Sequence, residues 1–295
     1  MWRLALVILA VVCVLLFLFV LWLPSRVVNG TRMTLDESFN RQSGFYDTSF
    51  YQSLHKTAYT VKGFGGYLLH VVLLENPMPT TEYVILTHGY TDNRMGALKY
   101  VPMYLRLGYN CIVYDLRGHG ENKKTFTTYG VRESLDLDCL VKDTRERYAG
   151  LTSLGLHGES LGAATTVMCM KYKPKVDFAV ADCGFSDIEN VLRDIYRNAH
   201  MPAFLLGLTS IGAKLRYGHS MKEMRPIDSL KENDIPILFL HGAEDTFILP
   251  KNSEDMAKRT RGRAQYHVIP GARHAESILA AQETYERIVK EFLGG

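Results

Sequence analysis

The chain has 295 residues, of which 47% are hydrophobic and 22% are charged, a balance that excludes wholesale disorder and suits one globular α/β domain. The formal net charge of +3 is too small for the concentrated basic face that binds nucleic acid, so no nucleic-acid partner is expected. The cysteines form no CxxC pair and no Cys/His cluster, so neither a disulfide framework nor a metal site is expected.

An uncharged apolar run opens the chain and covers residues 4–23. As a helix rising about 1.5 Å per residue, it would span the roughly 30 Å hydrocarbon core of a bilayer. It is longer than the apolar region of a usual signal peptide, and Leu21–Pro24 offers no small-residue cleavage site. We therefore predict a retained transmembrane anchor over residues 1–25, which makes the cell membrane a partner; a cleaved signal sequence is the alternative.

The charges that flank this run leave its orientation ambiguous. Arg3 and the α-amino group lie on one side, whereas Arg26, Arg32 and Arg41 lie on the other, so counting positive charges would put the folded domain in the cytoplasm. Long domains, however, translocate largely regardless of such charges. We therefore expect the folded domain to be extracytoplasmic.

The next segment, residues 26–56, is mixed and polar with aromatic interruptions, which indicates a linker that also packs on the body. The domain proper is expected over residues 57–295. It begins with two apolar runs, Thr57–Val61 and Tyr67–Leu74, joined by a glycine-rich turn. This pattern predicts an antiparallel hairpin at the start of the sheet.

Strand and helix patterns alternate after the hairpin. The further predicted strands are Tyr83–Thr87, Asn110–Tyr114, Ser153–Leu156, Phe178–Ala181, Ile237–Leu240 and Gln265–Ile269. The helices predicted among and after them are Ser134–Tyr148, Leu161–Tyr172, Ser253–Thr260 and Glu276–Leu293. This alternation predicts an α/β fold with a mainly parallel sheet flanked by helices, whose ligand crevice lies at the carboxyl ends of the strands. The long connection at about residues 185–235 predicts a helical cap.

One motif lies between a predicted strand and a predicted helix. Gly158-Glu159-Ser160-Leu161-Gly162 is a G-x-S-x-G sequence that follows Ser153–Leu156 and opens the next helix. In that context a sharp turn presents the serine hydroxyl to substrate, and the glycines leave room for the neighbouring backbone. Ser160 is therefore the candidate nucleophile, and a helix N-cap serine is the alternative.

A nucleophilic serine needs a base to accept its proton and an acid to orient that base. Asp245 and His274 each come just after a predicted strand, in the order serine, acid, base. Asp182, after the preceding strand, is the rival acid. For the oxyanion, the N–H of Leu161 follows the nucleophile, and the N–H of Tyr90 lies in the loop after Tyr83–Thr87.

These motifs, together with His88-Gly89-Tyr90 and Tyr114–Gly120, resemble the α/β-hydrolase superfamily from about Thr57 to Leu293. The chain is most similar to bacterial membrane-anchored members that are grouped with esterases and serine peptidases. The resemblance implies the α/β-hydrolase fold with a helical cap, and a Ser-His-Asp triad of Ser160, His274 and Asp245 that needs no metal and no organic cofactor. It does not identify the substrate.

The function expected from these residues is hydrolysis of a small-molecule carboxylic ester or acyl substrate through an acyl-enzyme. The alternative is a serine peptidase acting on short peptides, which would need a charged group in the cap, with Glu223 and Glu232 as candidates. A non-catalytic binding protein would be expected to lack a member of the triad. The apolar run Met201–Leu208 could line an acyl pocket or pack a cap helix onto the body, and the sequence leaves the oligomeric state open.

Overall fold

Eight strands form a single sheet in the computed structural model, which describes residues 2–294. They are β1 (Lys56–Lys62), β2 (Leu68–Leu74), β3 (Glu82–Thr87), β4 (Tyr109–Tyr114), β5 (Ser153–Glu159), β6 (Phe178–Asp182), β7 (Ile237–Gly242) and β8 (Ala264–Ile269). Their order across the sheet is β1-β2-β4-β3-β5-β6-β7-β8. β2 is antiparallel to both of its neighbours, and all other neighbouring pairs are parallel.

This topology confirms the predicted fold class, including the antiparallel hairpin at the start. The clearest difference lies in β5, which was predicted to end at Leu156 but continues to Glu159. His157, Gly158 and Glu159 pair in register with the end of β6. Their polar and small side chains hid this extension in the sequence, because it is the neighbouring strand, and not local propensity, that keeps them extended.

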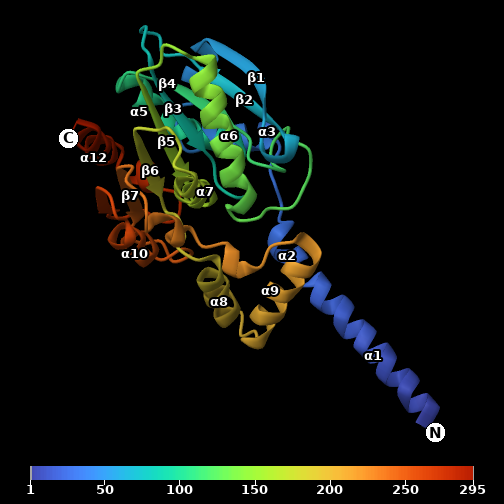
Figure 1. Cartoon of the computed structure of the whole chain (residues 1–295). Helices are drawn as coiled ribbons and strands as arrows, with labels where there is room; N and C mark the ends of the chain where they lie inside the picture. Colours follow the sequence, from blue (N-terminus) through green and yellow to red (C-terminus); the bar gives the residue numbers. More distant parts are fainter. Residues whose placement is uncertain (1, 295) are drawn as a thin grey trace.

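Helices cover both faces of the sheet (Figure 1). The helices of the body are α5 (Val101–Arg106), α6 (Val131–Arg147), α7 (Leu161–Cys169), α10 (Lys251–Arg259), α11 (Ser277–Ala280) and α12 (Gln282–Gly294). The body also has two short 3₁₀ segments, η1 (Phe64–Gly66) and η3 (Met170–Tyr172), and a longer one, η2 (Arg94–Tyr100). The last predicted helix, Glu276–Leu293, is thus two helices with a break at Ala281.

The core is divided by the sheet into two apolar layers. Alternate residues of each strand face opposite layers: in β7, Ile237 and Phe239 pack with α7 and α10, whereas Leu238 and Leu240 pack with α5 and α12. Because both faces are covered, the inner parallel strands consist of nearly continuous apolar runs, whereas the edge strand β8 is more polar and only partly buried. The sheet is therefore a rigid frame whose strand ends carry the polar residues described below.

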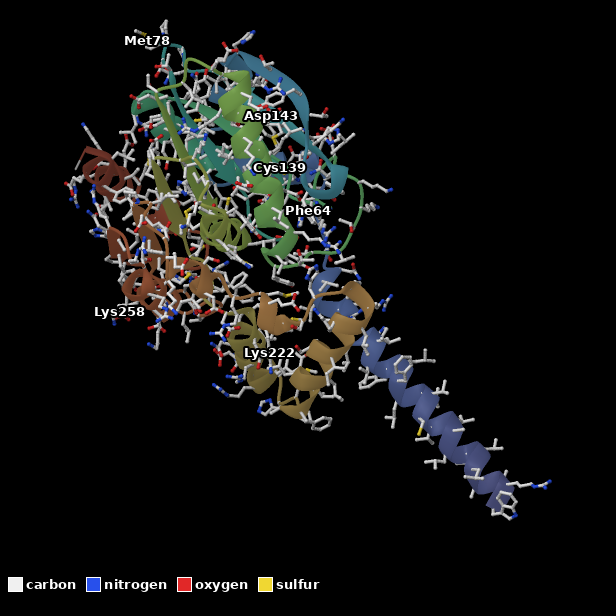
Figure 2. The ribbon with its side chains drawn as sticks, in the orientation of Figure 1. Phe64, Met78, Cys139, Asp143, Lys222 and Lys258 are labelled. Atoms are coloured by element: carbon white, nitrogen blue, oxygen red, sulfur yellow. The ribbon has the colours of Figure 1, made fainter. Side chains whose placement is uncertain are left out.

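The N-terminal helix α1 (Trp2–Trp22) leaves the body as an isolated rod (Figure 1). Most of its side chains project into open space (Figure 2), and none of its residues is buried, although its last turn contacts the cap helix α9 (Phe204–Tyr217) at Val20 and Leu21. Among the residues described, it is the one helix long and apolar enough to cross a membrane. By length and composition alone, α1 fits a membrane span or a signal sequence.

The segment after α1 packs tightly onto the body. It contains the short helices α2 (Ser25–Val28), α3 (Leu35–Ser43) and α4 (Phe50–Ser53). The guanidinium of Arg32 donates hydrogen bonds to the carbonyls of Gly118 and Thr125, at 2.5 and 2.6 Å. Ser38 and Gln42 of α3 bond the carboxylate of Asp92. These bonds fix the segment to the loops at the carboxyl ends of the strands.

The long connection after β6 holds a helical cap, as predicted. It consists of α8 (Ile188–Asn198), α9 (Phe204–Tyr217) and two 3₁₀ segments, η4 (Met221–Glu223) and η5 (Pro226–Leu230). Figure 1 shows α8 and α9 on the side of the body from which α1 departs. The cap therefore lies between the end of α1 and the carboxyl ends of the strands.

Candidate active site

The turn between β5 and α7 places Ser160 at the carboxyl edge of the sheet. Its backbone has φ 54° and ψ −113°, a conformation with positive φ that costs a residue other than glycine about 1–3 kcal/mol. The Ser160 N–H donates to the carbonyl of Asp182 at 2.9 Å, which holds the turn to β6. Such a strained turn at a strand end lifts the hydroxyl away from the sheet.

The two glycines of the motif allow this turn to approach its neighbours. A Cβ atom at Gly158 would lie 2.1 Å from the carbonyl oxygen of Gly162, and a Cβ at Gly162 would lie 2.1 Å from that of Thr87. Both separations are far shorter than a van der Waals contact, and both obstacles are backbone atoms that cannot rotate away. The glycines are therefore required by backbone contacts on both sides of Ser160.

Ser160, His274 and Asp245 lie in one chain of hydrogen bonds. The Oγ of Ser160 is 3.0 Å from Nε2 of His274, and Nδ1 of the same ring is 2.7 Å from Oδ2 of Asp245. With the ring proton on Nδ1, His274 donates to the carboxylate and accepts from the hydroxyl. This is the spacing that base-assisted nucleophilic attack requires.

Asp245 is almost fully buried, yet it is held as a carboxylate. Although burial opposes ionisation, hydrogen bonds from His241 and His274 keep the pKa of Asp245 well below its ordinary value. The backbone N–H groups of Phe247 and Ile248 also donate to Oδ1, each at 2.9 Å. Asp245 can therefore orient His274 and offset a positive charge on its ring.

The rival acid, Asp182, does not bond His274 in the described structure. Its carboxylate accepts hydrogen bonds from the hydroxyls of Tyr100, Ser277 and Tyr285, at 2.9–3.1 Å. Burial, and next the charge of Glu159, raise the pKa of Asp182 to about 6. Asp182 therefore belongs to a buried polar network behind the site.

Tyr90 and Leu161, whose N–H groups are the candidate oxyanion donors, both line the cavity above Ser160. Leu161 is the first residue of α7, where an N–H has no partner within the helix. The side chain of Tyr90 is fixed by the N-terminal segment: its hydroxyl donates to the carbonyl of Val27 and accepts from the N–H of Gly30, both at 2.8 Å. The loop that carries the Tyr90 N–H is therefore held in place by hydrogen bonds from the N-terminal segment.

A cavity of about 700 Å³ opens over Ser160 and His274. Three of the parts of the chain that line it are far apart in sequence. The cap contributes apolar side chains, the loop after β7 contributes Phe247 and Ile248, and the end of α1 with the segment behind it contributes Trp22, Leu23 and Val27. The apolar cap residues that line it are Ile188, Val191, Leu192, Ile195, Tyr196 and Met201.

This lining decides between the two alternatives that the sequence left open for the cap. Of the apolar run Met201–Leu208, only Met201 lines the cavity. Phe204 is exposed, and Leu206 packs into the core under the cap. The apolar wall that could contact an acyl chain is formed by α8 instead. Helix α9 packs against α8 and α1, outside the cavity.

Sequence reasoning missed two contributors to the site, His241 and Lys99. His241, at the end of β7, supports Asp245; Lys99 and Glu159 form a buried ion pair that borders the cavity. Lys99 also donates to the carbonyl of Ala275, beside His274, at 2.7 Å. The sequence held one indication of the role of His241, which lies at the end of a strand and four residues before Asp245. No local pattern in the sequence indicates that Lys99 belongs to the site.

The two cap carboxylates considered for peptide recognition lie elsewhere. Glu223 is exposed and pairs with Lys214, and Glu232 is exposed as well; neither lines the cavity. Within residues 2–294 there is also no group of three or more His, Cys, Asp or Glu side chains arranged to hold a metal ion. The polar residues that line the cavity, besides Ser160 and His274, are Arg26, Arg41, Gln42, Thr91, Asp92, Lys99, Glu159 and Glu276.

Comparison with known proteins places these features in a family. Residues 97–293 match the model of the prolyl oligopeptidase family. A protein of Bacillus subtilis (strain 168), described as the uncharacterized protein YqkD, is 31% identical over 252 residues, which cover 82% of this chain and 81% of that protein.

Solved structures are similar at the level of the fold. The esterase Pf2001 of Pyrococcus furiosus superposes with a TM-score of 0.70 at 22% identity, covering 84% of this chain and 94% of that one. An esterase from Exiguobacterium antarcticum superposes with a TM-score of 0.59 at 15% identity, covering 81% and 100% of the two chains. The predicted resemblance to the α/β-hydrolase superfamily is thereby confirmed.

The backbone contact at Gly162 generates a prediction for stability. Gly162→Ala should destabilise the protein by several kcal/mol, at the upper end of single substitutions, because its Cβ would collide with the Thr87 carbonyl. Gly150→Ala is the matched control, since a Cβ there meets no atom within 4 Å. Thermal unfolding of both variants in the same detergent would measure the difference. Equal melting temperatures would contradict the packing argument.

The raised pKa of Asp182 generates a prediction for pH. A carboxyl whose folded pKa of about 6 exceeds its ordinary value of 3.8 stabilises the fold at low pH, and this contribution is lost as the pH rises through 6. Relative to Asp182→Asn, the wild type should therefore lose roughly 1–3 kcal/mol of unfolding free energy between pH 4.5 and pH 7.5. Denaturant unfolding of both proteins at the two pH values measures this loss, and a difference of opposite sign would refute it.

Proposed function

This chain belongs to the prolyl oligopeptidase family and is a serine hydrolase of the α/β-hydrolase fold, and we propose that it hydrolyses carboxylic esters with Ser160 as its nucleophile. The observation that carries the proposal is the hydrogen-bonded series Ser160, His274, Asp245 at the floor of a largely apolar cavity. Such a cavity suits an acyl chain better than a peptide backbone, whose polar groups would need partners.

In the proposed reaction, the Oγ of Ser160 attacks the acyl carbon while Nε2 of His274 takes its proton. The carboxylate of Asp245 stabilises the imidazolium that forms. Negative charge on the carbonyl oxygen is met by the N–H groups of Tyr90 and Leu161. His274 then gives its proton to the departing alcohol, which leaves an acyl-enzyme.

Hydrolysis of the acyl-enzyme repeats these roles with water as the nucleophile. His274 removes a proton from water, the hydroxide attacks the acyl carbon, and the carboxylic acid is released as Ser160 recovers its proton. All of the groups in this scheme belong to the chain itself. The rate depends on how accurately the turn at Ser160 and the loop at Tyr90 are held.

A serine peptidase for short peptides is the second candidate, and the family match favours it. One structural observation supports it: Glu159 borders the cavity and could face the amino terminus of a peptide. Against it, this carboxylate is already paired with buried Lys99. Parallel assays of 4-nitrophenyl esters and aminoacyl 4-nitroanilides would separate the two candidates.

We also propose that α1 is retained as a membrane anchor, with the catalytic domain on the extracytoplasmic side. Two features support retention: α1 is apolar and has no buried residue, and its last residue, Trp22, forms part of the cavity wall. Tryptophan is enriched at the membrane interface, where its ring spans the apolar and polar layers. Long domains translocate largely regardless of flanking positive charges, so Arg26, Arg32 and Arg41 do not oppose the extracytoplasmic orientation.

For the nucleophile, we expect Ser160→Ala to abolish ester turnover and labelling by a fluorophosphonate probe while the fold is unchanged. Loss of a triad nucleophile typically removes most of the rate enhancement and leaves roughly 10³–10⁴ over the uncatalysed rate. The measurement is kcat/KM for 4-nitrophenyl acetate together with probe labelling and circular dichroism. Undiminished labelling of the variant would exclude Ser160.

For the acid, Asp245→Asn should lower the acylation rate by about 10⁴-fold, because the amide favours the wrong tautomer of His274. Asp182→Asn is the matched control and should have a far smaller effect, since Asp182 bonds tyrosine and serine hydroxyls. Pre-steady-state acylation by 4-nitrophenyl acetate measures both. A larger loss at Asp182 would reassign the acid.

For the anchor, a chain beginning at Ser25 should move from the membrane fraction to the soluble fraction. It should hydrolyse 4-nitrophenyl acetate at close to the full-length rate, because the residues of the proposed mechanism all lie beyond Ser25. Cell fractionation and kcat/KM measure the two effects. A folded but inactive truncated protein would show that α1 takes part in catalysis.

A further inference from the structure

The outer face of α9 carries a stripe of apolar side chains that the body does not cover. Phe204, Ile211 and Leu215 are 66%, 54% and 60% exposed, and Leu208 between them is half-buried. Their spacing of three and four residues puts all four on one face of the helix. The buried residues of α9, among them Leu206 and Ala213, lie on the opposite side.

This stripe lies directly beside α1. A Cβ at Gly212 would meet the carbonyl oxygen of Val20 at 2.0 Å, so the two helices touch backbone to backbone. Arg216, at the end of α9, donates a hydrogen bond to the carbonyl of Leu21 at 3.0 Å. Gly212 follows Ile211 and is turned about 100° from it around the helix. The stripe therefore continues the apolar surface of α1 at the end nearest to the body.

The same region borders the mouth of the catalytic cavity. Trp22, the last residue of α1, lines that cavity from one side, and the exposed apolar residues Ile195 and Met201 line it from the cap. Met201 is followed within three residues by Phe204, where the stripe begins. An apolar path thus runs from the exposed face of α9, past the end of α1, to Ser160.

We propose that the apolar face of α9 is inserted into the leaflet that surrounds the end of α1, so that the cavity opens to the bilayer and takes an acyl ester resident in that bilayer. This inference rests on the proposed esterase function and on the proposed anchor. Lipid is the occupant that the geometry selects, because lipid packed around Val20 and Leu21 must also cover the helix that touches them. Amphipathic helices bind at the interface in this way through a buried apolar face.

The test uses the full-length protein in phosphatidylcholine vesicles. The paired variant Ile211→Asp, Leu215→Asp puts two charges on the stripe without touching the cavity, which neither residue lines. Met78→Asp is the matched control: Met78 is 73% exposed and lies at the opposite end of the molecule from α1 (Figure 2). The two substrates are monoolein in the vesicle and 4-nitrophenyl acetate in water.

We expect the paired variant to lower kcat/KM for monoolein by at least about tenfold, because two apolar side chains no longer hold the cavity against the lipid. Its kcat/KM for the acetate ester should stay within about twofold of wild type, since the groups that react are unchanged. Met78→Asp should alter neither value. Equal losses for both substrates, or no loss for monoolein, would overturn the inference.

Two other results would also overturn it. If the wild type cleaves the acetate ester but not monoolein, the substrate does not come from the bilayer. If the paired variant converts a detergent-solubilised dimer into a monomer, a second copy of the chain covers the stripe instead of lipid. Size-exclusion chromatography with light scattering distinguishes these species.

A second measurement is independent of catalysis. Ile211→Trp is made in a protein that also carries Trp2→Phe and Trp22→Phe, which removes the two native tryptophans. Phosphatidylcholine brominated on its acyl chains should then quench the fluorescence of the Ile211→Trp protein, whereas the fluorescence of Met78→Trp in the same background should remain unquenched. Quenching, together with a wild type that hydrolyses neither ester, would refute the esterase function but retain the docking of α9, and absence of quenching would refute the docking.

Discussion

The backbone of Ser160 occupies a conformation with positive φ that only close packing on all sides can maintain. Gly158 and Gly162 let the turn approach α7 and β3 within backbone contact, and the Asp182 carbonyl receives the Ser160 N–H. Every other feature of the site depends on this turn. His274 can contact the Ser160 hydroxyl because the turn presents that hydroxyl at the edge of the sheet. Helix α7 begins directly after the turn.

The parallel sheet explains why residues that are far apart in sequence meet at this turn. Ser160, Asp245 and His274 follow β5, β7 and β8, whose carboxyl ends all lie at one edge. The hydrogen bonds that hold Asp245 come from the loop that follows β7 and from His241 at the end of that strand. Asp245 is therefore held in place largely by the segment of chain that carries it.

The features that were predictable from the sequence are those encoded locally. Strands such as Ile237–Leu240 are apolar runs whose period and length are visible in the sequence, and G-x-S-x-G has a fixed relation to the strand and helix around it. The walls of the cavity were not predictable, because they depend on where helices pack. Phe204 and Met201 are equally apolar and close in sequence, yet one faces outward and the other lines the cavity. The pair of Lys99 and Glu159 was also hidden, since the partners are brought together only by the fold.

The stretch from Trp22 to Arg41 both continues the N-terminal helix and forms a wall of the cavity. The Tyr90 hydroxyl forms hydrogen bonds with the backbone of Val27 and Gly30 in this stretch. The stretch therefore helps to hold the loop that carries Tyr90 beside Ser160. The N-terminal helix and the hydrolase body are consequently not independent modules. Exchanging the stretch up to Arg41 with that of a relative would transfer a wall of the cavity together with the apolar helix. Sequence drift in this stretch can thus change selectivity while every residue of the hydrolase body stays the same.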